Sequence, residues 1–507
     1  MSMPAEHLIS VPTLADLLQG FADAPAVPVS GIASDSRLLA EGHLFLACQG
    51  VASHGVDYLQ EALAAGVGAI AIDGSTADLP ADVGVPVVAV EDLAGKLGEI
   101  ANRFYDYPSQ QLKIVGVTGT NGKTTVAWLV AQCEMLLGES CGYIGTLGYG
   151  VRELAGTEGM TTPAAVELHG RLAEFVEQQA TCAAIEVSSH ALSQRRVDGV
   201  RFEAALFTNL TRDHLDYHAD MQQYYDSKAS LFVDADVRSR IVNIDSNWGS
   251  ELAKRCGTDV IIVSLQPDRI VDRTADRRRF LFVRSVMTHE QGSDFKFASS
   301  WGDGEVSLPL PGDFNVANAA LVLTLLLQQG VEMEHACAAL SQVSAPPGRM
   351  QRASSHGVAA YVDYAHTPGA MQSALRALRA HCTGSLWCVF GCGGERDSGK
   401  RPLMARAAEE FADHVVITSD NPRNESPQSI IDEIVDGLDQ PQRATIIDDR
   451  AAAIAWAIGH AAAADVVLIA GKGHETYQQV GDQMLPFSDL LVARAALGCN
   501  EQEASDD

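Results

Sequence analysis

Short apolar runs alternate with longer amphipathic stretches along most of the chain. The runs at 44–47, 69–72 and 87–90 are aliphatic and have the length of buried strands. The stretch at 58–65 carries apolar residues at helical spacing. Strands that alternate with helices predict parallel sheets covered by helices, which is an α/β architecture.

The same alternation recurs in the last third of the chain, where a strand-like run is followed by a polar loop four times. These runs begin near Ala359, Leu386, His414 and Asp465, and helical stretches separate them. The pattern predicts a Rossmann-like, doubly wound parallel sheet, which binds ligands outside the carboxyl ends of its strands. The Pro-Pro-Gly segment at 346–348 has the composition of a stiff linker.

The length of the chain, 507 residues, exceeds one ordinary hydrophobic core, so we predict several domains. We place an N-terminal α/β domain at residues 1–108, a central domain at 109–345 and a C-terminal domain at 346–507. Mixed strands are expected over 241–306 in the central domain.

A glycine-rich loop at 118–125 is the first stretch with clear chemistry. An apolar, β-branched run precedes it and a helical pattern follows, which is the order of strand, phosphate loop and helix in a P-loop. Backbone N–H groups of such a loop surround phosphate oxygens, and the helix N-terminus adds partial positive charge. We expect Lys123 to reach the β/γ-phosphates and the Thr124 hydroxyl to bind Mg²⁺. Val117 stands where the strict template has glycine, and the alternative is a glycine-rich turn with a solvated lysine.

Charge and cysteine content narrow the class of protein. The formal net charge of −29 argues against nucleic acid or an anionic membrane as a general partner, because both require basic surface. The ten cysteines show neither paired nor metal-binding spacing and indicate reduced thiols. The N-terminus is not that of a signal peptide, and no apolar run is long enough to span a bilayer. We therefore expect a cytoplasmic multidomain enzyme.

Further polar residues stand where strands or helices are expected to end or begin. Glu186 closes an apolar run in the P-loop domain, where an acid can hold Mg²⁺, although a paired structural glutamate is the alternative. Asn315 and Asn318 share one face of a first helical turn and could be capping residues. Ser36 lies in an Asp-Ser-Arg segment that suits either a capped turn or a phosphorylated ligand. Lys228, taken alone, would be a surface lysine.

The polar loops of the last third suit a zwitterionic amino acid. Their charged and amide residues are Arg396, Asp420, Asn421, Arg423 and Glu475. Guanidinium groups clamp carboxylates with two hydrogen bonds, and acids hold ammonium groups. The alternative is a set of capped turns and surface ion pairs.

The loop Thr-Gly-Thr-Asn-Gly-Lys-Thr-Thr resembles that of the Mur ligases and folylpolyglutamate synthetases, which use ATP to form an acyl phosphate and then an amide bond. The order Asn-Leu-x-x-Asp-His-Leu-Asp-x-His at 209–218, followed by a helix lysine, is specific to the Mur ligases. Gly-x-Phe-Asn-x-x-Asn at 312–318, Asp-Asn-Pro-Arg at 420–423 and Gly-x-Gly-His-Glu at 471–475 follow in order. The resemblance therefore covers essentially the whole chain.

The resemblance implies a set of residues for each ligand. For ATP these are Gly116, Thr118, Gly119, Thr120, Asn121, Gly122, Lys123, Thr124, Thr125, Asn315 and Arg349. For the UDP-linked substrate, whose uridine end is expected in the N-terminal domain, they are Ser34, Ser36, Thr161, Thr162, Ser188, Gln194 and Arg196. For diaminopimelate they are Arg396, Asp420, Asn421, Pro422, Arg423, Gly471 and Glu475. For the metal they are Thr124, Glu186, His214 and Lys228.

The resemblance also implies the catalytic residues Lys123 and Lys228, with Lys228 carrying a carbamate derived from CO₂. A free ammonium would repel Mg²⁺, whereas a carbamylated lysine offers the anionic oxygen that Mg²⁺ prefers. The sequence indicates no obvious general base. Asp363 and His366, at a predicted strand end, are candidates.

Within the family, the motifs are most similar to those of enzymes that add meso-2,6-diaminopimelate to UDP-N-acetylmuramoyl-L-alanyl-D-glutamate in peptidoglycan synthesis. An arginine such as Arg423 would select the extra carboxylate of diaminopimelate, because lysine would leave the guanidinium unpaired. Three alternatives remain: a lysine-adding relative, a folylpolyglutamate synthetase-like ligase, and a nucleotide switch without bond-forming activity. The expected partners are small-molecule substrates, without nucleic acid or membrane insertion, and the chain is expected to be a monomer.

Overall fold

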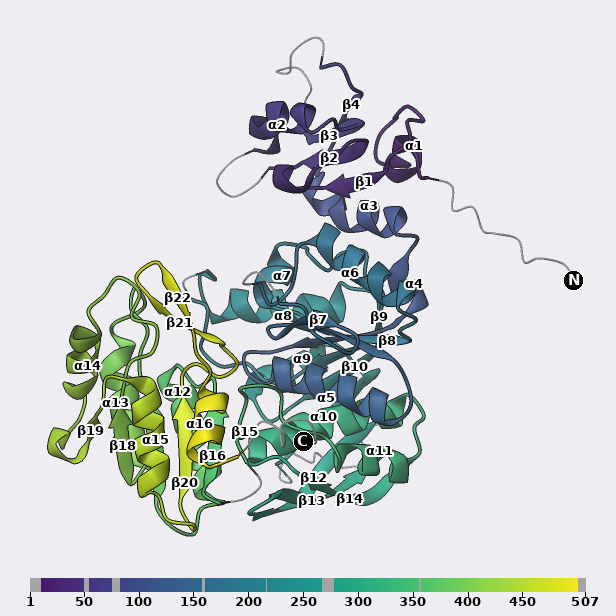
Figure 1. Ribbon diagram of the computed structural model, residues 1–507. Helices are drawn as coiled ribbons and strands as arrows, with labels where there is room; N and C mark the ends of the chain where they lie inside the picture. The colour runs from purple at the N-terminus through teal and green to yellow at the C-terminus, as the bar shows by residue number, and fades with distance from the viewer. Residues whose placement is uncertain are drawn as a thin grey trace, which may run out of the picture. The chain divides into compact units, whose positions relative to one another are not determined.

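The computed structural model describes residues 11–49, 54–74, 83–156, 160–215, 217–266, 278–354 and 357–499 (Figure 1). Two parts of the predictions lie outside these ranges. They are residues 1–10, which are most of the segment predicted not to be a signal peptide, and Asp216 of the motif at 209–218. The chain divides into two compact units, one of residues 1–123, 138–240 and 251–260, the other of 124–137, 241–250 and 261–507. The domain borders near 108 and 345 remain predictions.

The first unit begins with a small parallel sheet of order β1-β2-β3-β4. Its strands are β1 (Gly31–Ala33), β2 (His43–Ala47), β3 (Ala69–Asp73) and β4 (Val87–Val90). Successive side chains of a strand point to opposite faces, so Leu44 and Leu46 join the cluster that includes α1 (Leu14–Leu18) and α3 (Leu97–Phe104). Phe45 packs on the other face with α2 (Leu59–Ala64). The predicted strands and the helix at 58–65 are confirmed.

The first unit also holds the strands that carry the phosphate loop, in the order β10-β9-β5-β8-β6-β7. They are β5 (Lys113–Thr118), β6 (Cys141–Gly145), β7 (Gly148–Gly150), β8 (Cys182–Glu186), β9 (Phe202–Phe207) and β10 (Val237–Asn243). Its helices include α4 (Pro108–Gln111), α6 (Ala165–Glu177), α7 (Ser189–Ser193) and α8 (Met221–Val233). Because β5 runs parallel to both β8 and β9, the three carboxyl ends meet at one edge. The segments after these strands are thereby brought together.

The second unit contains α5 (Lys123–Leu136), which begins with the phosphate-loop lysine, and a predominantly antiparallel group of strands. These are β11 (Val260–Ser264), β12 (Phe280–His289), β13 (Gly292–Ser299) and β14 (Gly302–Leu308), with β12 to β14 forming a meander. The helices α10 (Asp313–Gln328) and α11 (Met333–Leu340) follow, and α9 (Asn247–Arg255) precedes β11. The mixed strands expected over 241–306 are present.

The C-terminal part of the second unit is a six-stranded sheet of order β15-β16-β20-β17-β18-β19. Its strands are β15 (Gln351–Arg352), β16 (Ala359–Asp363), β17 (Leu386–Phe390), β18 (His414–Ile417), β19 (Thr445–Ile446) and β20 (Val466–Ala470). All pair in parallel except β15, which pairs with β16 in antiparallel fashion. The doubly wound sheet predicted from four strand-and-loop repeats is confirmed, whereas β15, β19 and the hairpin of β21 (Tyr477–Val480) and β22 (Gln483–Pro486) were not predicted.

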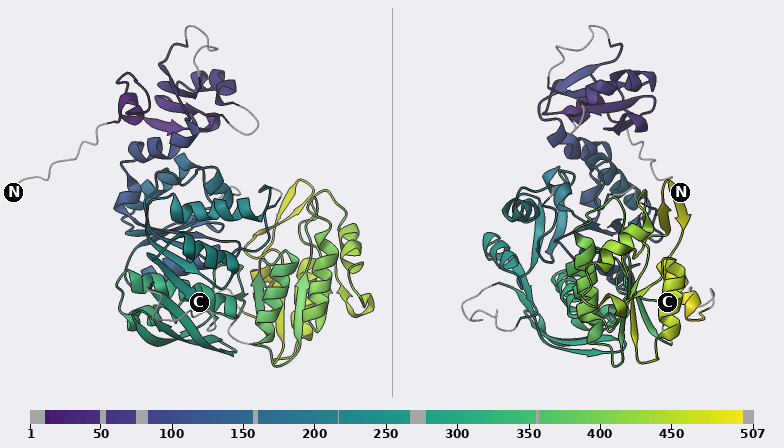
Figure 2. Two further views of the ribbon diagram at one scale, coloured as in Figure 1. Left: turned by 180° about the vertical axis from the view of Figure 1, so that it is seen from behind. Right: turned by 90° about the vertical axis from the view of Figure 1, so that its left-hand side faces the viewer.

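Helices cover both faces of this C-terminal sheet (Figures 1 and 2). One face packs against α12 (Pro368–Arg379), α13 (Lys400–Phe411) and α14 (Pro427–Val435), and the other against α15 (Arg450–His460) and α16 (Asp489–Ala496). Successive side chains of β20 explain why both faces are covered. Leu468 packs in the cluster on the first face, and Val467 and Ile469 pack in the cluster on the second. Among the described residues, no helix has both the length and the apolar character to cross a bilayer.

Candidate active site

The phosphate loop follows β5 and requires glycine where it bends. Gly119 has φ +148°, and a Cβ added there would lie 1.9 Å from Thr208 Oγ1. The loop is held from the segment after β9: the Thr208 hydroxyl donates to Asn121 O (2.6 Å), and Asn121 N donates to Asn209 Oδ1 (3.0 Å). Thr120 N donates to Asn209 O (2.9 Å). The loop is therefore preformed by contacts of the protein itself.

Two lysines converge on one carbonyl of this loop. Lys123 Nζ donates to Gly119 O (3.0 Å) and Thr120 O (2.9 Å), and Lys228 Nζ donates to the same Gly119 oxygen (2.9 Å). Lys228 is only 1% exposed, which excludes the alternative of a surface lysine. Burial, and then the charge of Lys123, lower the pKa of Lys228 well below its ordinary value. The environment therefore favours a neutral amine at Lys228.

The segment after β9 also brings histidines and a tyrosine to the phosphate loop. His214 has a left-handed backbone (φ +52°), and its ring centroid lies 5.1 Å from that of His190 and 5.9 Å from that of Tyr224. The Tyr224 hydroxyl lies 3.1 Å from Thr120 Oγ1, and burial raises the pKa of Tyr224 to about 12. Lys228 Nζ lies 4.7 Å from the centroid of the same ring. Sequence reasoning missed His190 and Tyr224, although Tyr224 stands four residues before Lys228 on one helix face.

Glu186 is the last residue of β8, and its backbone pairs with that of Val117 in β5. Its carboxylate is buried and accepts from the Tyr143 hydroxyl (2.5 Å), Thr146 N (2.9 Å) and the Thr146 hydroxyl (3.2 Å). These hydrogen bonds agree with the alternative interpretation, in which Glu186 is a structurally paired glutamate. They also hold the carboxylate at the edge where β5 passes into the phosphate loop.

Four of the five residues assigned to the UDP-linked substrate in the predicted central domain form one hydrogen-bonded group around Thr162. Its hydroxyl donates to Glu186 O (2.7 Å) and accepts from Ser188 N (3.1 Å). Arg196 donates to Thr162 O (2.8 Å) and to Gln194 Oε1 (2.6 and 3.0 Å), and burial lowers its pKa. The hydroxyl of the fifth residue, Thr161, lies 3.3 Å from that of Thr146. Substrate contacts by this group remain a prediction.

The Asp-Ser-Arg segment of the N-terminal sheet forms a capped turn. Asp35 accepts from Arg37 N (3.0 Å) and pairs with the Arg37 guanidinium (2.5 Å). Ser36 donates to Glu61 Oε2 (2.9 Å), and Ser34 is exposed. The hydrogen bonds are those of the capped-turn alternative, and a uridine role for Ser34 and Ser36 stays a prediction.

In the second unit, Asn315 lies buried in the first turn of α10. Its Nδ2 donates to Pro311 O (2.8 Å), and its Oδ1 accepts from Asn318 Nδ2 (3.4 Å). The N-cap of α10 is Gly312 and carries no side-chain cap, so neither asparagine is the capping residue of the alternative; their amides bond to the preceding loop and to each other. Arg349 stacks its guanidinium over the ring of Tyr364, with 4.3 Å between Cζ and the ring centroid. Nucleotide contacts of Asn315 and Arg349 remain predictions.

The two candidate bases differ in how their polar atoms are occupied. Asp363 ends β16, and its two carboxylate oxygens accept from Met350 N and Ala365 N, each at 2.8 Å. Burial raises its pKa, and Arg349 opposes this rise. His366 is exposed, and its Nδ1 donates to Tyr364 O (2.7 Å), which leaves Nε2 as the acceptor nitrogen. The geometry suits a structural role for Asp363 better than it suits a base.

The residues assigned to diaminopimelate meet at the carboxyl ends of β17, β18 and β20; we call this set the amino-acid crevice. It comprises Arg396, Asp420, Asn421, Pro422, Arg423, Gly471 and Glu475. Arg423 has φ +52° and donates from Nη1 to Gly394 O (2.7 Å), while Arg396 is exposed. Asn421 Nδ2 donates to Glu475 Oε2 (2.8 Å). A Cβ on Gly471 (φ +115°) would lie 2.8 Å from Asp420 Oδ2.

Two buried cations below this crevice escaped sequence reasoning. Lys472 is fully buried beside Asn421 and Glu475. Arg450 pairs with the buried Asp489 (2.7 Å) and donates to Ala470 O (2.9 Å) at the end of β20. The sequence around Arg450 contains no pattern that distinguishes it from a surface arginine. Lys472 occupies the variable position of the Gly-x-Gly-His-Glu motif, which was its only signal in the sequence.

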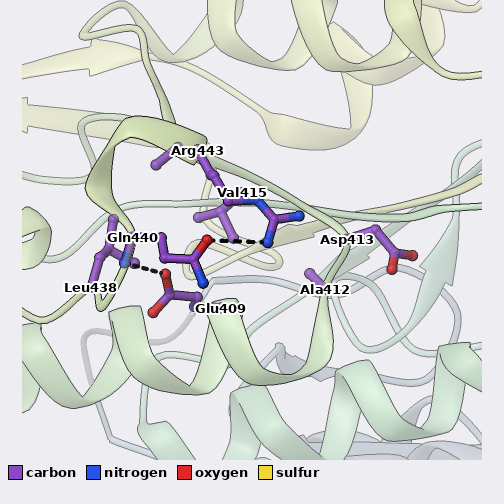
Figure 3. Close-up of a pocket in the computed structure, with 8 residues that line it drawn as sticks. Glu409, Ala412, Asp413, Val415, Leu438, Gln440 and Arg443 are labelled. Atoms are coloured by element: carbon purple, nitrogen blue, oxygen red, sulfur yellow. Dashed lines mark hydrogen bonds between the residues drawn. The ribbon is translucent and has the colours of Figure 1, made fainter.

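A small pocket lies away from this crevice, near the amino end of β18 (Figure 3). Its cavity volume is about 40 Å³, and it opens to the surface. Glu409 accepts from Gln440 N (2.8 Å) at its rim, and Gln440 accepts from Arg443 (3.4 Å). Its lining contains none of the residues assigned above to a ligand.

Comparisons with known proteins agree with the phosphate loop and the fold. Residues 28–105 match the family model for the catalytic domain of the Mur ligase family, residues 117–326 the Mur ligase middle domain, and residues 348–473 the Mur ligase glutamate ligase domain. The chain belongs to the Mur ligase family and is an ATP-dependent ligase. The family and the enzyme class predicted from the motifs are confirmed.

Individual relatives make the likeness more specific. The chain is 43% identical over 472 residues to the UDP-N-acetylmuramoyl-L-alanyl-D-glutamate--2,6-diaminopimelate ligase of Coxiella burnetii (strain RSA 493 / Nine Mile phase I), covering 93% of this chain and 96% of that one. A solved structure of a ligase of the same name is 31% identical with a TM-score of 0.72, covering 98% and 100%. MurF from Acinetobacter baumannii shares the fold, at 18% identity and a TM-score of 0.62, covering 91% and 95%.

Proposed function

We propose that this chain joins meso-2,6-diaminopimelate to UDP-N-acetylmuramoyl-L-alanyl-D-glutamate, with conversion of ATP to ADP and phosphate, as a step of peptidoglycan precursor synthesis. The observation that carries this proposal is the 43% identity, over 93% of the chain, to a ligase named for these two substrates. The amino-acid crevice supports it, because two arginines and a glutamate stand where a diamino dicarboxylic acid would bind.

The reaction divides into two balanced steps. The γ-phosphoryl group of ATP passes to the D-glutamate carboxylate, so that ADP leaves and an acyl phosphate forms. An amine of diaminopimelate then attacks the acyl carbon, phosphate leaves and the amine loses a proton. The backbone N–H groups of the phosphate loop and Lys123 bind the charge that develops on the transferring group. His366, through its acceptor nitrogen, remains a candidate to take the proton.

The residues proposed for Mg²⁺ have suitable donors. Among the described residues no group of three or more His, Cys, Asp or Glu side chains could hold a metal. The proposed set depends instead on two such residues, Glu186 and His214, on the Thr124 hydroxyl and on a modified Lys228. Mostly oxygen donors of this kind fit Mg²⁺, which when bound neutralises charge on the phosphates.

The surroundings of Lys228 support its proposed carbamate. A neutral amine is the nucleophile toward CO₂, and burial beside Lys123 favours the neutral form. A nitrogen–carbon bond forms, one proton is released, and the product is an anion. The change gives Lys123 an anionic neighbour in place of a second amine that shares the Gly119 carbonyl.

The crevice distinguishes this proposal from its alternatives. A lysine-adding relative would leave Arg423 without a substrate carboxylate, and a nucleotide switch would not need a crevice for a zwitterion. A folylpolyglutamate synthetase-like enzyme would not need the N-terminal uridine domain. The cytoplasmic location and the monomeric state remain predictions.

An amide-forming assay tests the proposal. UDP-N-acetylmuramoyl-L-alanyl-D-glutamate and ATP are supplied with diaminopimelate, lysine or ornithine, and both the amide product and released phosphate are measured. We expect product mainly with diaminopimelate, and phosphate release only when both organic substrates are present. Product mainly with lysine, or phosphate release that ignores the organic substrates, would overturn the proposal.

A further inference from the structure

Lys472 is a buried charged residue beside the amino-acid crevice that has no substrate role above. It follows β20, and its side chain is 0% exposed. Its Nζ donates to Asn421 Oδ1 (2.9 Å) and to Glu475 Oε2 (2.9 Å), and lies 3.9 Å from Asp420 Oδ1. A buried ammonium is stable only when such partners surround it. The ammonium therefore belongs to a fixed network and not to a flexible surface chain.

Lys472 decides how the amide of Asn421 is oriented. Asn421 Oδ1 accepts from Lys472 and also from Gln479 N (2.9 Å), and both of these groups can only donate. A reversed amide would face two donors with its NH₂ group. Its Nδ2 is therefore the atom that faces Glu475 and donates to Oε2 (2.8 Å).

The same network divides the two oxygens of Glu475 between protein and ligand. Oε2 accepts from both Lys472 and Asn421. Oε1 accepts no hydrogen bond within the part of the chain that the structure describes. One oxygen thus anchors the carboxylate, and the other is available to a donor outside the protein. Lys472 also offsets one of the two negative charges that Asp420 and Glu475 place there.

We propose that Lys472 is a positioning residue that orients Asn421 and Glu475, so that Glu475 Oε1 accepts the distal ammonium of the amino-acid substrate. This inference rests on the proposed function, since it assigns a task within the same crevice. Arg423 would bind the distal carboxylate of the substrate. The network around Lys472 would bind its distal ammonium. The two groups should therefore control two separable selectivities.

Two substrate comparisons separate these roles. 2-Aminopimelate keeps the distal carboxylate of diaminopimelate but lacks the distal ammonium, whereas lysine keeps the ammonium and lacks the carboxylate. Lys472→Met retains the length of the side chain without its charge. We expect the KM for diaminopimelate to rise about 10- to 100-fold, as for loss of charge-assisted hydrogen bonds. The preference for diaminopimelate over 2-aminopimelate should shrink, while its preference over lysine persists.

The experiment measures kcat and KM for ATP, the UDP-linked substrate, diaminopimelate and lysine, together with kcat/KM or Ki for 2-aminopimelate. Lys296→Met, the same change at an exposed lysine of β13, is the matched control and should behave as wild type. If Lys472→Met does not fold, Lys472→Gln, which keeps an N–H donor but no charge, takes its place and should show the same selective rise in the KM for diaminopimelate.

The outcomes separate the inference from the proposed function. An unchanged KM for diaminopimelate, an equal rise of all KM values, or loss of the preference over lysine would overturn the inference. Failure of the wild-type enzyme to use diaminopimelate would instead overturn the proposed function. A selective loss of ammonium recognition supports both.

Discussion

At the scale of single residues, the strongest feature is that Lys123 and Lys228 share the Gly119 carbonyl. Two ammonium groups on one acceptor repel each other, and burial adds a desolvation penalty for Lys228. Proton loss from Lys228 relieves both costs. The pKa shift and the geometry therefore point to the same chemical state, which is the one that reacts with CO₂.

We expect Lys228→Ala to lose ligase activity by roughly 10²-fold or more, because it would remove the anionic oxygen that the proposed carbamate supplies beside the transferring phosphate. Added acetate or formate should restore part of the activity by filling the vacated oxygen position. Amide formation with and without the carboxylate is the measurement. Lys254→Ala, at a lysine whose side chain is 73% exposed, is the control. Full activity of Lys228→Ala without any carboxylate would contradict the carbamate.

Arg423→Ala tests carboxylate recognition at the same scale. If Arg423 binds the distal carboxylate as proposed, lysine leaves the guanidinium without that charged partner, which costs on the order of 2–5 kcal/mol, or roughly thirty-fold to several thousand-fold in selectivity. The variant should raise the KM for diaminopimelate and narrow its advantage over lysine. ATP and the UDP-linked substrate should bind as before. A preference that stays unchanged would show that another residue reads the carboxylate.

At the scale of elements, the phosphate loop depends on the strand beside it. Gly119 packs against Thr208, and Asn121 bonds to Asn209, so the segment after β9 determines the shape of a loop that follows β5. The parallel pairing of β5 with β8 and β9 brings these ends together. In the C-terminal sheet, Arg450 likewise ties the end of β20 to α16 through Asp489.

Gly119→Ala should therefore raise the KM for ATP strongly, because the new Cβ would meet Thr208 Oγ1 at 1.9 Å and displace the loop. Gly138→Ala is the matched control. Gly138 also has positive φ (+90°), but a Cβ there meets nothing within 4 Å, so it should cost only about 1 kcal/mol of stability. Thermal unfolding and ATP titration of both variants give the comparison. An equal effect on ATP affinity would exclude the steric explanation.

At the scale of the whole molecule, charge governs association. A formal net charge of −29 opposes self-association through repulsion between copies. We expect sedimentation of a monomer of 53.9 kDa at physiological salt. Sedimentation equilibrium over a range of protein concentrations checks this expectation, and a stable dimer at micromolar concentration would contradict it.

The sequence by itself determined those parts of the protein whose chemistry is contiguous. Strand, glycine-rich loop and helix of the P-loop follow one another in 113–137, so local spacing was enough to predict them. The four strand-and-loop repeats predicted the doubly wound sheet for the same reason, because in each repeat the apolar run and the polar loop that follows it are contiguous in the sequence. The short strands β15 and β19 carried too few residues to show a pattern.

Only the tertiary structure decided which of these residues are buried and what they face. Lys228 contacts a carbonyl 109 residues away, and Lys472 contacts Asn421 at a separation of 51 residues. Burial and electrostatic environment depend on such distant neighbours, so no local pattern marks either lysine as buried. The motifs thus named the family, whereas the fold revealed a lysine buried beside the phosphate loop and a second lysine buried against Asn421 and Glu475.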